Sequence, residues 1–295
     1  MKIGLFSSDP WSRRMNRLKE LIEDRGESAI RVIPWKVSRE GATDRHRIML
    51  GNNNLSKLDA LLVLDLGAND IGAFFNRVGL LSALTEMGVE VINSVASILL
   101  MRNKSESMRK LISGGLPVPR TLITESIETA AEFVLENHPC VLKPITGFGG
   151  LGVQLISEQF DIENVYDYLK FHSQMFGKGA YILQELIEGP GFDIRAFVLD
   201  GEVVATMQRY SDDGFVTNIH SGGRARNNDI NVSDLAIAAA KSVSGRIVGV
   251  DIIPDNNGEL WILEVNATPG WNALQRISDV DIADLIADSL INAEF

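Results

Sequence analysis

Short apolar runs alternate along this chain with stretches in which apolar residues recur every three or four positions. The short runs are typical of buried strands, and the wider spacing is typical of amphipathic helices. In the N-terminal part, the pattern predicts strands over residues 2–7, 29–34, 60–66 and 89–93. It predicts helices over residues 12–25 and 74–87, and a loop over the polar stretch 38–56. This alternation indicates an α/β lobe over residues 1–94.

A second group of elements begins with one long helical pattern over residues 95–112. A further helix is expected over residues 129–137, followed by strands at 140–145 and 153–157 and a helix at 163–174. The two strands flank a glycine-rich segment. We therefore assign residues 95–177 to a central α+β lobe.

The remaining residues, 178–295, form an expected C-terminal α+β lobe that is rich in hairpins. Asp200-Gly201 and the DNNG turn at 255–258 each lie between two strand-like runs, which is a strong hairpin signal. Helices are expected at 232–243 and 282–292. The fold class is therefore a mixture of α/β and α+β lobes.

Composition narrows the class of protein. With 295 residues, 45% of them hydrophobic, the chain can bury a large core. The formal net charge of -11 disfavours a nucleic-acid partner, because such proteins usually carry a basic surface. No apolar run is long enough to cross a membrane. A single cysteine, Cys140, which we interpret as a core residue, fits a cytoplasmic location.

The glycine-rich segment GFGGLG contains Gly147, Gly149, Gly150 and Gly152. It matches G-x-G-x-x-G, but a dinucleotide site needs a helix after the loop, and a strand-like run follows here. A flexible hairpin tip whose backbone N–H groups face phosphates is the interpretation that we favour over a plain turn. Lys143, on the strand that leads into this loop, is well placed to reach the phosphates.

Three oxygen-bearing side chains are expected to converge on the last hairpin. Glu264 and Asn266 are two apart on a strand and share a face, and the DNNG turn folds Asp251 back beside them. Carboxylate and amide oxygens suit Mg²⁺. The alternative is that they are ordinary surface residues. The apolar segments around them favour the metal site, because buried carboxylates need a cation.

These pieces occur together in a recognisable order. Lys104 is followed by VLKP with Lys143, the glycine segment, QELI at 184–187, DIR at 193–195, TNIHSGG at 217–223, GVD at 249–251 and EVN at 264–266. Over residues 90–295 the chain resembles the ATP-grasp ligases, and within them the RimK-like α-L-glutamate ligases. The branch it most resembles is that of the archaeal pterin-tail ligases.

The resemblance implies an ATP-grasp fold in which two α+β lobes clasp the nucleotide behind an N-terminal pre-ATP-grasp lobe. It implies ATP and two Mg²⁺ or Mn²⁺ ions as cofactors, with Asp251, Glu264 and Asn266 as metal ligands. It places Arg195 and Arg209 at the reacting acyl phosphate. The implied nucleotide-binding residues are Lys104, Lys143, the four glycines, Gln184, Glu185, Leu186, Ile187, Asp193 and Asn218.

The resemblance also implies a reaction. An ATP-dependent ligase of this kind adds L-glutamate to an acceptor carboxylate through an acyl phosphate, and the acceptor is expected to be the tail of a pterin coenzyme, tetrahydromethanopterin. The alternatives are a ribosomal protein, a peptide, a deazaflavin coenzyme or an amino-acid carrier protein. The ribosomal branch usually has a basic residue where Val216 stands. A catalytically silent nucleotide-binding module is the alternative from another class.

Substrate contacts are expected from Arg224, His220 and Trp271. Arg224 and Arg226 could clamp substrate carboxylates, or lie in a surface loop. Trp271 could stack on a flat acceptor ring, or pack in the core. The family also suggests a homo-oligomer, either a dimer or a tetramer.

Overall fold

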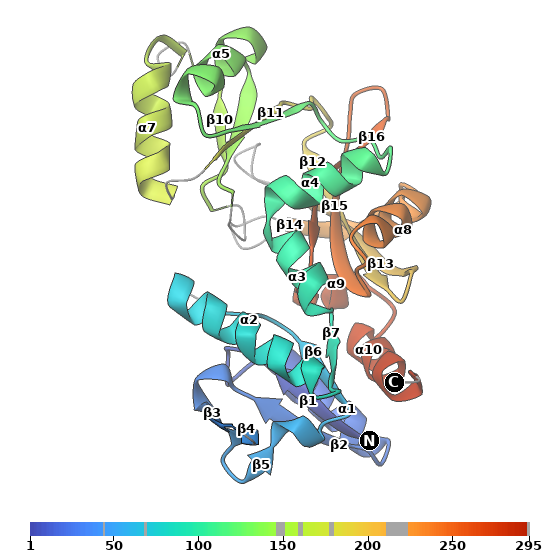
Figure 1. Cartoon of the computed structure of the whole chain (residues 1–295). Helices are drawn as coiled ribbons and strands as arrows, with labels where there is room; N and C mark the ends of the chain where they lie inside the picture. The colour runs from blue at the N-terminus through green and yellow to red at the C-terminus, as the bar shows by residue number, and fades with distance from the viewer. Residues whose placement is uncertain are drawn as a thin grey trace.

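The computed structural model describes residues 1–43, 45–67, 70–145, 151–158, 162–176, 180–210 and 224–293. Within these residues the chain forms four sheets. Figure 1 shows the N-terminal elements at one end, the C-terminal sheet in the middle and the sheet of β8 to β11 at the other end. The mixed α/β and α+β architecture that the sequence predicts is confirmed.

The N-terminal sheet is parallel, with the order β2-β1-β6-β7. Helix α1 (Arg13–Asp24) buries Met15 and Leu18 against one face, in the same cluster as Leu5. Helix α2 (Ile71–Glu86) buries Leu81 in the cluster that holds Phe6, on the other face. The strands are β1 (Lys2–Phe6), β2 (Ser28–Val32), β6 (Ala60–Val63) and β7 (Glu90–Ile92).

The prediction of a loop over residues 38–56 is wrong. This stretch forms a three-stranded antiparallel sheet of β3 (Val37–Ala42), β4 (Arg45–Leu50) and β5 (Asn53–Asn54). Nearly all of β3 is exposed, so the strand has no apolar alternation that a sequence could show. Ile48 and Leu55, both 0% exposed, anchor the segment to the core.

The single helix expected at 95–112 is two helices, α3 (Val95–Arg102) and α4 (Lys104–Ser113). Asn103 separates them, because its side-chain oxygen accepts from the backbone N–H groups of Ser105 and Glu106 and starts a new helix. Both helices contact β16 of the C-terminal sheet. They lie in the range that we assigned to the central lobe, and the lobe boundaries stay predictions.

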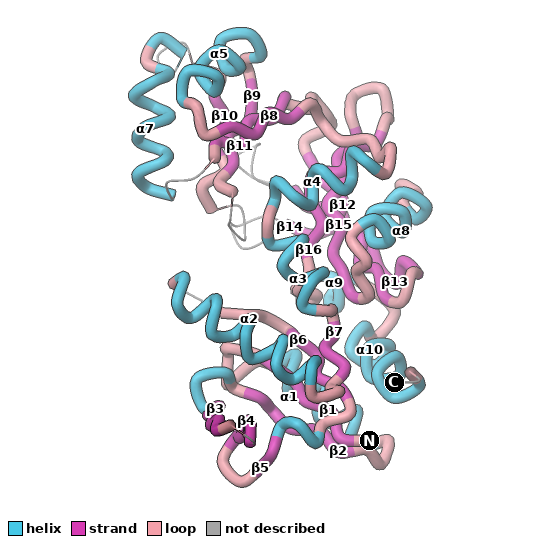
Figure 2. Tube along the Cα trace, viewed as in Figure 1, coloured by secondary structure: helices cyan, strands magenta, loops and turns pink. Residues whose placement is uncertain are grey.

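The central sheet is antiparallel, with the order β10-β9-β11-β8. Helices α5 (Ile127–Asn137) and α7 (Val165–Phe176) cover it, and Figure 2 separates them in cyan from the magenta strands. β9 and β10 pair directly, which confirms that strands flank the glycine segment. The strands are β8 (Thr121–Thr124), β9 (Cys140–Lys143), β10 (Gln154–Ile156) and β11 (Tyr181–Glu185).

The C-terminal sheet has the order β14-β13-β12-β15-β16 and is antiparallel. Both predicted hairpins are present, and Asp200 and Gly201 both have positive φ in the tight turn between β12 and β13. The strands are β12 (Phe192–Leu199), β13 (Glu202–Tyr210), β14 (Arg224–Asn227), β15 (Ile247–Pro254) and β16 (Leu260–Asn266). The helices are α8 (Ser233–Ser242), α9 (Asn272–Ile277) and α10 (Ile282–Asn292).

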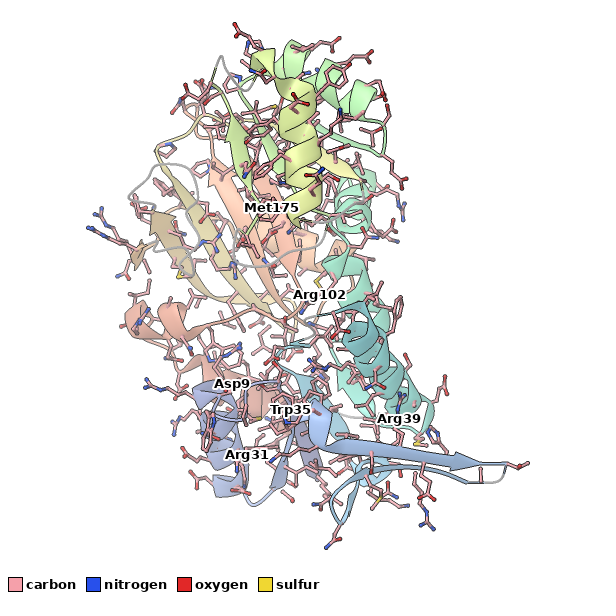
Figure 3. All side chains as sticks on the ribbon, turned by 90° about the vertical axis from the view of Figure 1, so that its left-hand side faces the viewer. Asp9, Arg31, Trp35, Arg39, Arg102 and Met175 are labelled. Carbon is pink, nitrogen blue, oxygen red and sulfur yellow. The ribbon has the colours of Figure 1, made fainter. Side chains whose placement is uncertain are left out.

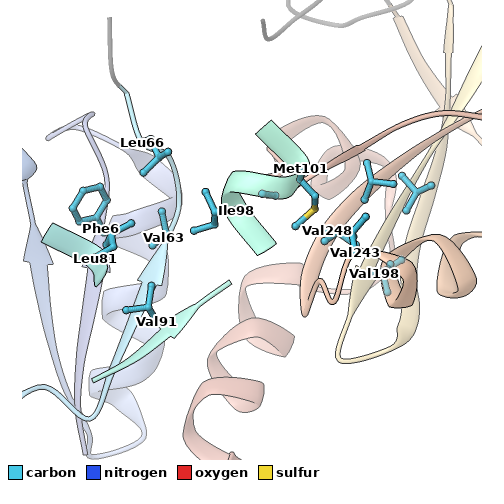
Figure 4. Close-up of a cluster of buried hydrophobic side chains, with 14 of the residues drawn as sticks. Phe6, Val63, Leu66, Leu81, Val91, Ile98, Met101, Val198, Val243 and Val248 are labelled. Carbon is cyan, nitrogen blue, oxygen red and sulfur yellow. The ribbon is translucent and has the colours of Figure 1, made fainter. Parts of the chain in front are cut away.

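The core runs without a break between the N-terminal and C-terminal sheets. Ile98 and Met101 of α3 lie between Val63 of the N-terminal sheet and Val248 of the C-terminal sheet (Figure 4). Helix α10 packs on α1 and shares a hydrophobic cluster with Phe197 and Ile247 of the C-terminal sheet. None of the helices in the described ranges combines the length and apolar character that crossing a membrane requires.

Candidate active site

The acidic hairpin has the predicted geometry. Asp251 on β15 lies directly opposite Glu264 on β16, and Asn266 lies opposite Gly249. The Nδ2 atom of Asn266 donates to Oε1 of Glu264 over 3.0 Å. The three oxygen-bearing side chains therefore lie on two neighbouring strands, as the sequence indicated.

Two buried arginines hold Asp251. Arg195, opposite it on β12, donates through Nε and, over 2.8 Å, through Nη2. Arg209 on β13 makes two 2.6 Å hydrogen bonds to Asp193 and lies 3.0 Å from Asp251. All four side chains belong to residues that are 8% exposed or less. The sheet register thus builds an alternating chain of charges across three strands.

This arrangement fixes the charge of Arg209. Burial alone would lower the pKa of its guanidinium, but the charges of Asp251 and Asp193 and their hydrogen bonds raise it well above its ordinary value. Arg209 therefore stays a cation and keeps Asp251 in place. Within the described residues, the Nη1 atoms of Arg195 and Arg209 donate no hydrogen bond, so each can face a further anion.

Lys104, the first residue of α4, brings a third cation to the hairpin. Its Nζ atom lies 2.5 Å from Oε2 of Glu264. Burial would raise the pKa of Glu264, but Lys104 and the hydrogen bonds to it and to Asn266 hold that pKa well below its usual range. Glu264 is therefore an anion at neutral pH.

Lys143 reaches the same region from the central sheet. Its Nζ atom donates to the side-chain oxygen of the buried Gln184, whose Nε2 donates to Thr121 over 2.9 Å. Burial lowers the pKa of Lys143 to about 8, Glu264 and Asp251 raise it, and Lys104 lowers it. Lys143 and Lys104 thus lie within electrostatic range of each other, as two lysines that share a polyphosphate would.

Of the four glycines in this segment, Gly152 is the one that the structure describes. This residue has φ of +77°, and an added Cβ would lie 2.9 Å from the ring of Phe176 on α7. Its carbonyl oxygen is 2.7 Å from Nε2 of His172, also on α7. The sequence held no signal for this contact. Gly147, Gly149 and Gly150 lie outside the described residues, as do Asn218 and His220.

Two of the implied nucleotide-binding residues, Glu185 and Asp193, already make hydrogen bonds within the protein. The backbone N–H of Glu185 donates to the carbonyl of Arg120 over 2.9 Å, and Leu186 and Ile187, which follow it, are half-buried. Both carboxylate oxygens of Asp193 accept from Arg209, so a ribose hydroxyl would have to donate to the remaining lone pairs of a carboxylate that is already paired. These nucleotide roles stay predictions.

Two of the three candidate substrate residues, Trp271 and Arg224, lie within the described residues. Trp271 is 4% exposed and packs edge-on against Phe197, so a flat acceptor ring cannot stack on it here and the core alternative holds. Arg224 is exposed at the start of β14, and Arg226 stacks over the ring of Tyr210, with its Cζ atom 4.6 Å from the centroid. Cys140 is fully buried, as interpreted, and burial raises the pKa of its thiol to about 11.

The residues of the acidic hairpin fit a magnesium site. Two carboxylates and an amide oxygen share one sheet, and Arg195 and Lys104 balance their charge. Magnesium binds through few protein oxygens and completes its shell with water and phosphate. Over the described ranges there is no cluster of three or more His, Cys, Asp or Glu side chains that could hold another ion.

Comparisons with known proteins identify the family of the chain. The family profile described as the RimK-like ATP-grasp domain matches residues 101–290. The tetrahydromethanopterin:alpha-L-glutamate ligase of Methanocaldococcus jannaschii is 34% identical over 242 residues, which are 80% of each chain. A probable alpha-L-glutamate ligase of Haemophilus influenzae is 31% identical over 307 residues, 99% of this chain and 98% of that one.

The same fold occurs in a solved structure of the ATP-grasp ligase PsnB complexed with a minimal precursor, Mg and ADP. The superposition covers 98% of this chain and 97% of the PsnB chain, with a TM-score of 0.72 and 24% sequence identity. The fold implies binding of ATP and Mg²⁺. The chain therefore belongs to the RimK-like ATP-grasp family and is an ATP-dependent ligase.

Proposed function

We propose that this enzyme joins the amino group of L-glutamate to an acceptor carboxylate on the tail of a pterin coenzyme. The similarity to the Methanocaldococcus jannaschii ligase over 80% of the chain supports both the amino acid and the acceptor. The observation that carries the chemistry is the charged cluster in which Arg195, Arg209 and Lys104 hold Asp251 and Glu264.

The reaction needs an activated carboxylate, because an amine does not displace oxide from a carboxylate at neutral pH. An oxygen of the acceptor carboxylate attacks the γ-phosphorus of ATP, the bond to the bridging oxygen breaks, and ADP leaves. The amine of glutamate loses a proton and attacks the carbonyl carbon of the acyl phosphate. The amide forms, the C–O bond breaks, and inorganic phosphate leaves.

The residues of the chain act mainly by position and charge. Lys104 at the start of α4 and Lys143 at the end of β9 hold the phosphates of the nucleotide from two different elements. The Nη1 atoms of Arg195 and Arg209, which donate to none of the residues that the structure describes, stabilise the negative charge that develops on the acyl phosphate and its tetrahedral successor. Asp251, Glu264 and Asn266 would hold two Mg²⁺ or Mn²⁺ ions, which supply further neutralisation of phosphate charge when bound.

The mass of the product tests this proposal. The enzyme is incubated with MgATP, L-glutamate and a panel of acceptors that contains a pterin coenzyme, a deazaflavin coenzyme and an acidic peptide. We expect ADP release that depends on the pterin, and a pterin product heavier by one glutamyl residue. Release that depends on another acceptor would refute the pterin proposal and keep the ligase. ADP release with a product that contains no glutamyl residue would refute glutamate as the amine substrate.

Two further features belong to the proposal. A homo-oligomer, either a dimer or a tetramer, is the assembly that we propose, and sedimentation of the purified enzyme measures it. The cytoplasm is the proposed location, in keeping with the single, fully buried cysteine.

A further inference from the structure

A second group of charged residues lies at the edge of the N-terminal sheet that faces the rest of the molecule. β1 and β6 are parallel neighbours, and the chain leaves them toward helices on opposite faces of the sheet. The carboxyl ends of such a pair of strands form a crevice, which is where open α/β sheets bind ligands. None of the residues at this edge is assigned a role in the proposed reaction.

Hydrogen bonds join the chain segments that follow β1 and β6. Asp65, which follows β6, accepts hydrogen bonds from Oγ of Ser7 over 2.6 Å, from the backbone N–H of Ser8 over 2.8 Å and from Oγ of Ser8. The loops approach so closely that a Cβ on Gly67 would lie 2.0 Å from that of Ser8. Three donors therefore already surround the carboxylate of Asp65.

Arg14, from the first turn of α1, connects this edge to the acidic hairpin. Its Nη1 atom donates to the carbonyl of Pro269 over 3.0 Å, and its Cζ atom lies 4.8 Å from the ring centroid of Trp271. Pro269 lies three residues after Asn266, and its ring also borders Gly249. The guanidinium is thus held next to the loop that follows the predicted metal ligand.

Arg102 belongs to a different helix, and the charge of Asp65 acts on it as it does on Arg14. It is the last residue of α3, two positions before Lys104, so the break at Asn103 separates the lysine that pairs with Glu264 from this arginine. Figure 3 shows Arg102 between the N-terminal elements and the rest of the molecule, on the same face as Asp9. In the part of the chain that the structure describes, Arg102 makes no hydrogen bond or ion pair.

The environment of the two arginines favours an anion. Burial lowers the pKa of both guanidinium groups, and the charge of Asp65 offsets only part of this effect. Burial lowers such a pKa when water is removed from a cation that lacks a full counter-charge. A bound carboxylate would supply that charge through the paired hydrogen bonds that arginine makes.

We propose that Arg14 and Arg102 bind the carboxylates of the incoming amino acid. This inference rests on the proposed function, in which glutamate keeps both carboxylates through the reaction while the acceptor carboxylate is phosphorylated beside Lys104 and Lys143. Two arginines match two persistent negative charges. Arg102 lies two residues before Lys104, and Arg14 bonds to the carbonyl of Pro269. The proposed site therefore places the amino acid on the side of the acidic hairpin that faces the N-terminal sheet.

The test is steady-state kinetics of Arg14→Met and Arg102→Met with each substrate varied in turn. We expect the KM for L-glutamate to rise about 10- to 100-fold in each variant, which corresponds to the loss of one charge-assisted hydrogen-bonded pair. The KM values for MgATP and for the acceptor should stay within about twofold of those of the native enzyme. The preference for glutamate over glutamine should fall by a similar factor, and Arg102→Lys should restore part of it.

The matched controls are Arg13→Met on the same turn of α1 and Arg109→Met on α4, because both arginines are exposed. Each should leave the KM for glutamate unchanged. An unchanged KM for glutamate in both crevice variants, or a rise in the KM for the acceptor alone, would overturn the inference while the native enzyme stays an active glutamate ligase. A native enzyme that shows no glutamate-dependent turnover would instead refute the proposed function.

Discussion

At the scale of single residues, the site depends on charges that compensate one another. Asp251 and Arg195 face each other across two strands, and Arg209 joins Asp193 to the same pair. Removal of one partner from such a buried group costs about 3–5 kcal/mol of stability, because the other charge is left unpaired. Glu264 is different, because its side chain is 30% exposed. A substitution at Glu264 should therefore affect catalysis with a smaller effect on stability than a substitution of a buried residue.

We therefore expect Glu264→Gln to lower kcat by about 100- to 1000-fold, since it removes one charge at the reacting phosphates and keeps the shape of the side chain. The thermal midpoint should change little. ADP release with both substrates present measures the effect, and Glu259→Gln, on the exposed turn before β16, is the control. ADP release at the native rate from Glu264→Gln would contradict the metal and phosphate assignment.

Lys143 gives the site a pH dependence. Its pKa of about 8 in the free enzyme means that the ammonium form is complete only below that pH. Because the triphosphate binds the charged form, affinity for a non-hydrolysable MgATP analogue should be constant below pH 8 and weaken by up to about tenfold per pH unit above it. Calorimetric titration between neutral and alkaline pH measures this. Lys143→Arg should bind without the alkaline loss, because arginine stays charged.

At the scale of elements, the strand–glycine–strand unit depends on how Gly152 meets α7. The left-handed backbone at Gly152 and the contact with Phe176 both exclude a side chain. His172 binds the carbonyl of the same glycine. Helix α7 therefore fixes one end of the segment whose backbone N–H groups we expect to face the phosphates.

Gly152→Ala should weaken binding of the MgATP analogue by about tenfold, because the added methyl group displaces the base of this segment. Gly258→Ala is the matched control, since Gly258 also has a positive φ, of +86°, but open space around it. Both variants should lose about 1–2 kcal/mol of stability through backbone strain. Equal analogue affinity in the two variants would show that the contact with α7 does not position the segment.

The sequence predicts most elements, because their apolar faces are buried and their spacing is regular. It predicts both C-terminal hairpins from their turns, and it places Asp251 and Glu264 side by side. It fails at β3, which exposes both faces, and at Asn103, which splits a continuous helical pattern. It cannot identify partners far apart in the chain, such as Lys104 with Glu264 or Gln184 with Thr121, because these follow from how the sheets are packed.

At the scale of the whole molecule, one buried amide joins the N-terminal lobe to the C-terminal sheet. The Nδ2 atom of Asn93 donates to the carbonyls of Ile247 and Ala267, both over 2.7 Å. Its Oδ1 accepts from the backbone N–H groups of Arg246 and Ile247, over 2.7 and 2.9 Å. Arg14 bonds to Pro269, two residues after Ala267, so the proposed amino-acid site would depend on this same junction.

Asn93→Ala should lower the free energy of unfolding by about 3–5 kcal/mol, because four buried backbone groups lose their partner. Urea unfolding measures the change. Asn292→Ala, at an exposed position in the last turn of α10, should shift it by less than about 0.5 kcal/mol. A loss below about 1 kcal/mol in Asn93→Ala would mean that the two parts are held together by the apolar core alone.

The central claim is that the acceptor carboxylate is activated by phosphorylation before glutamate attacks. The direct test uses an acceptor whose carboxylate oxygens carry heavy oxygen, with MgATP and L-glutamate, and mass spectrometry of the released phosphate. The account predicts one heavy oxygen in each phosphate, because the acceptor oxygen that attacks the γ-phosphorus leaves with it. Phosphate without heavy oxygen, formed together with the glutamyl product, would contradict the acyl phosphate.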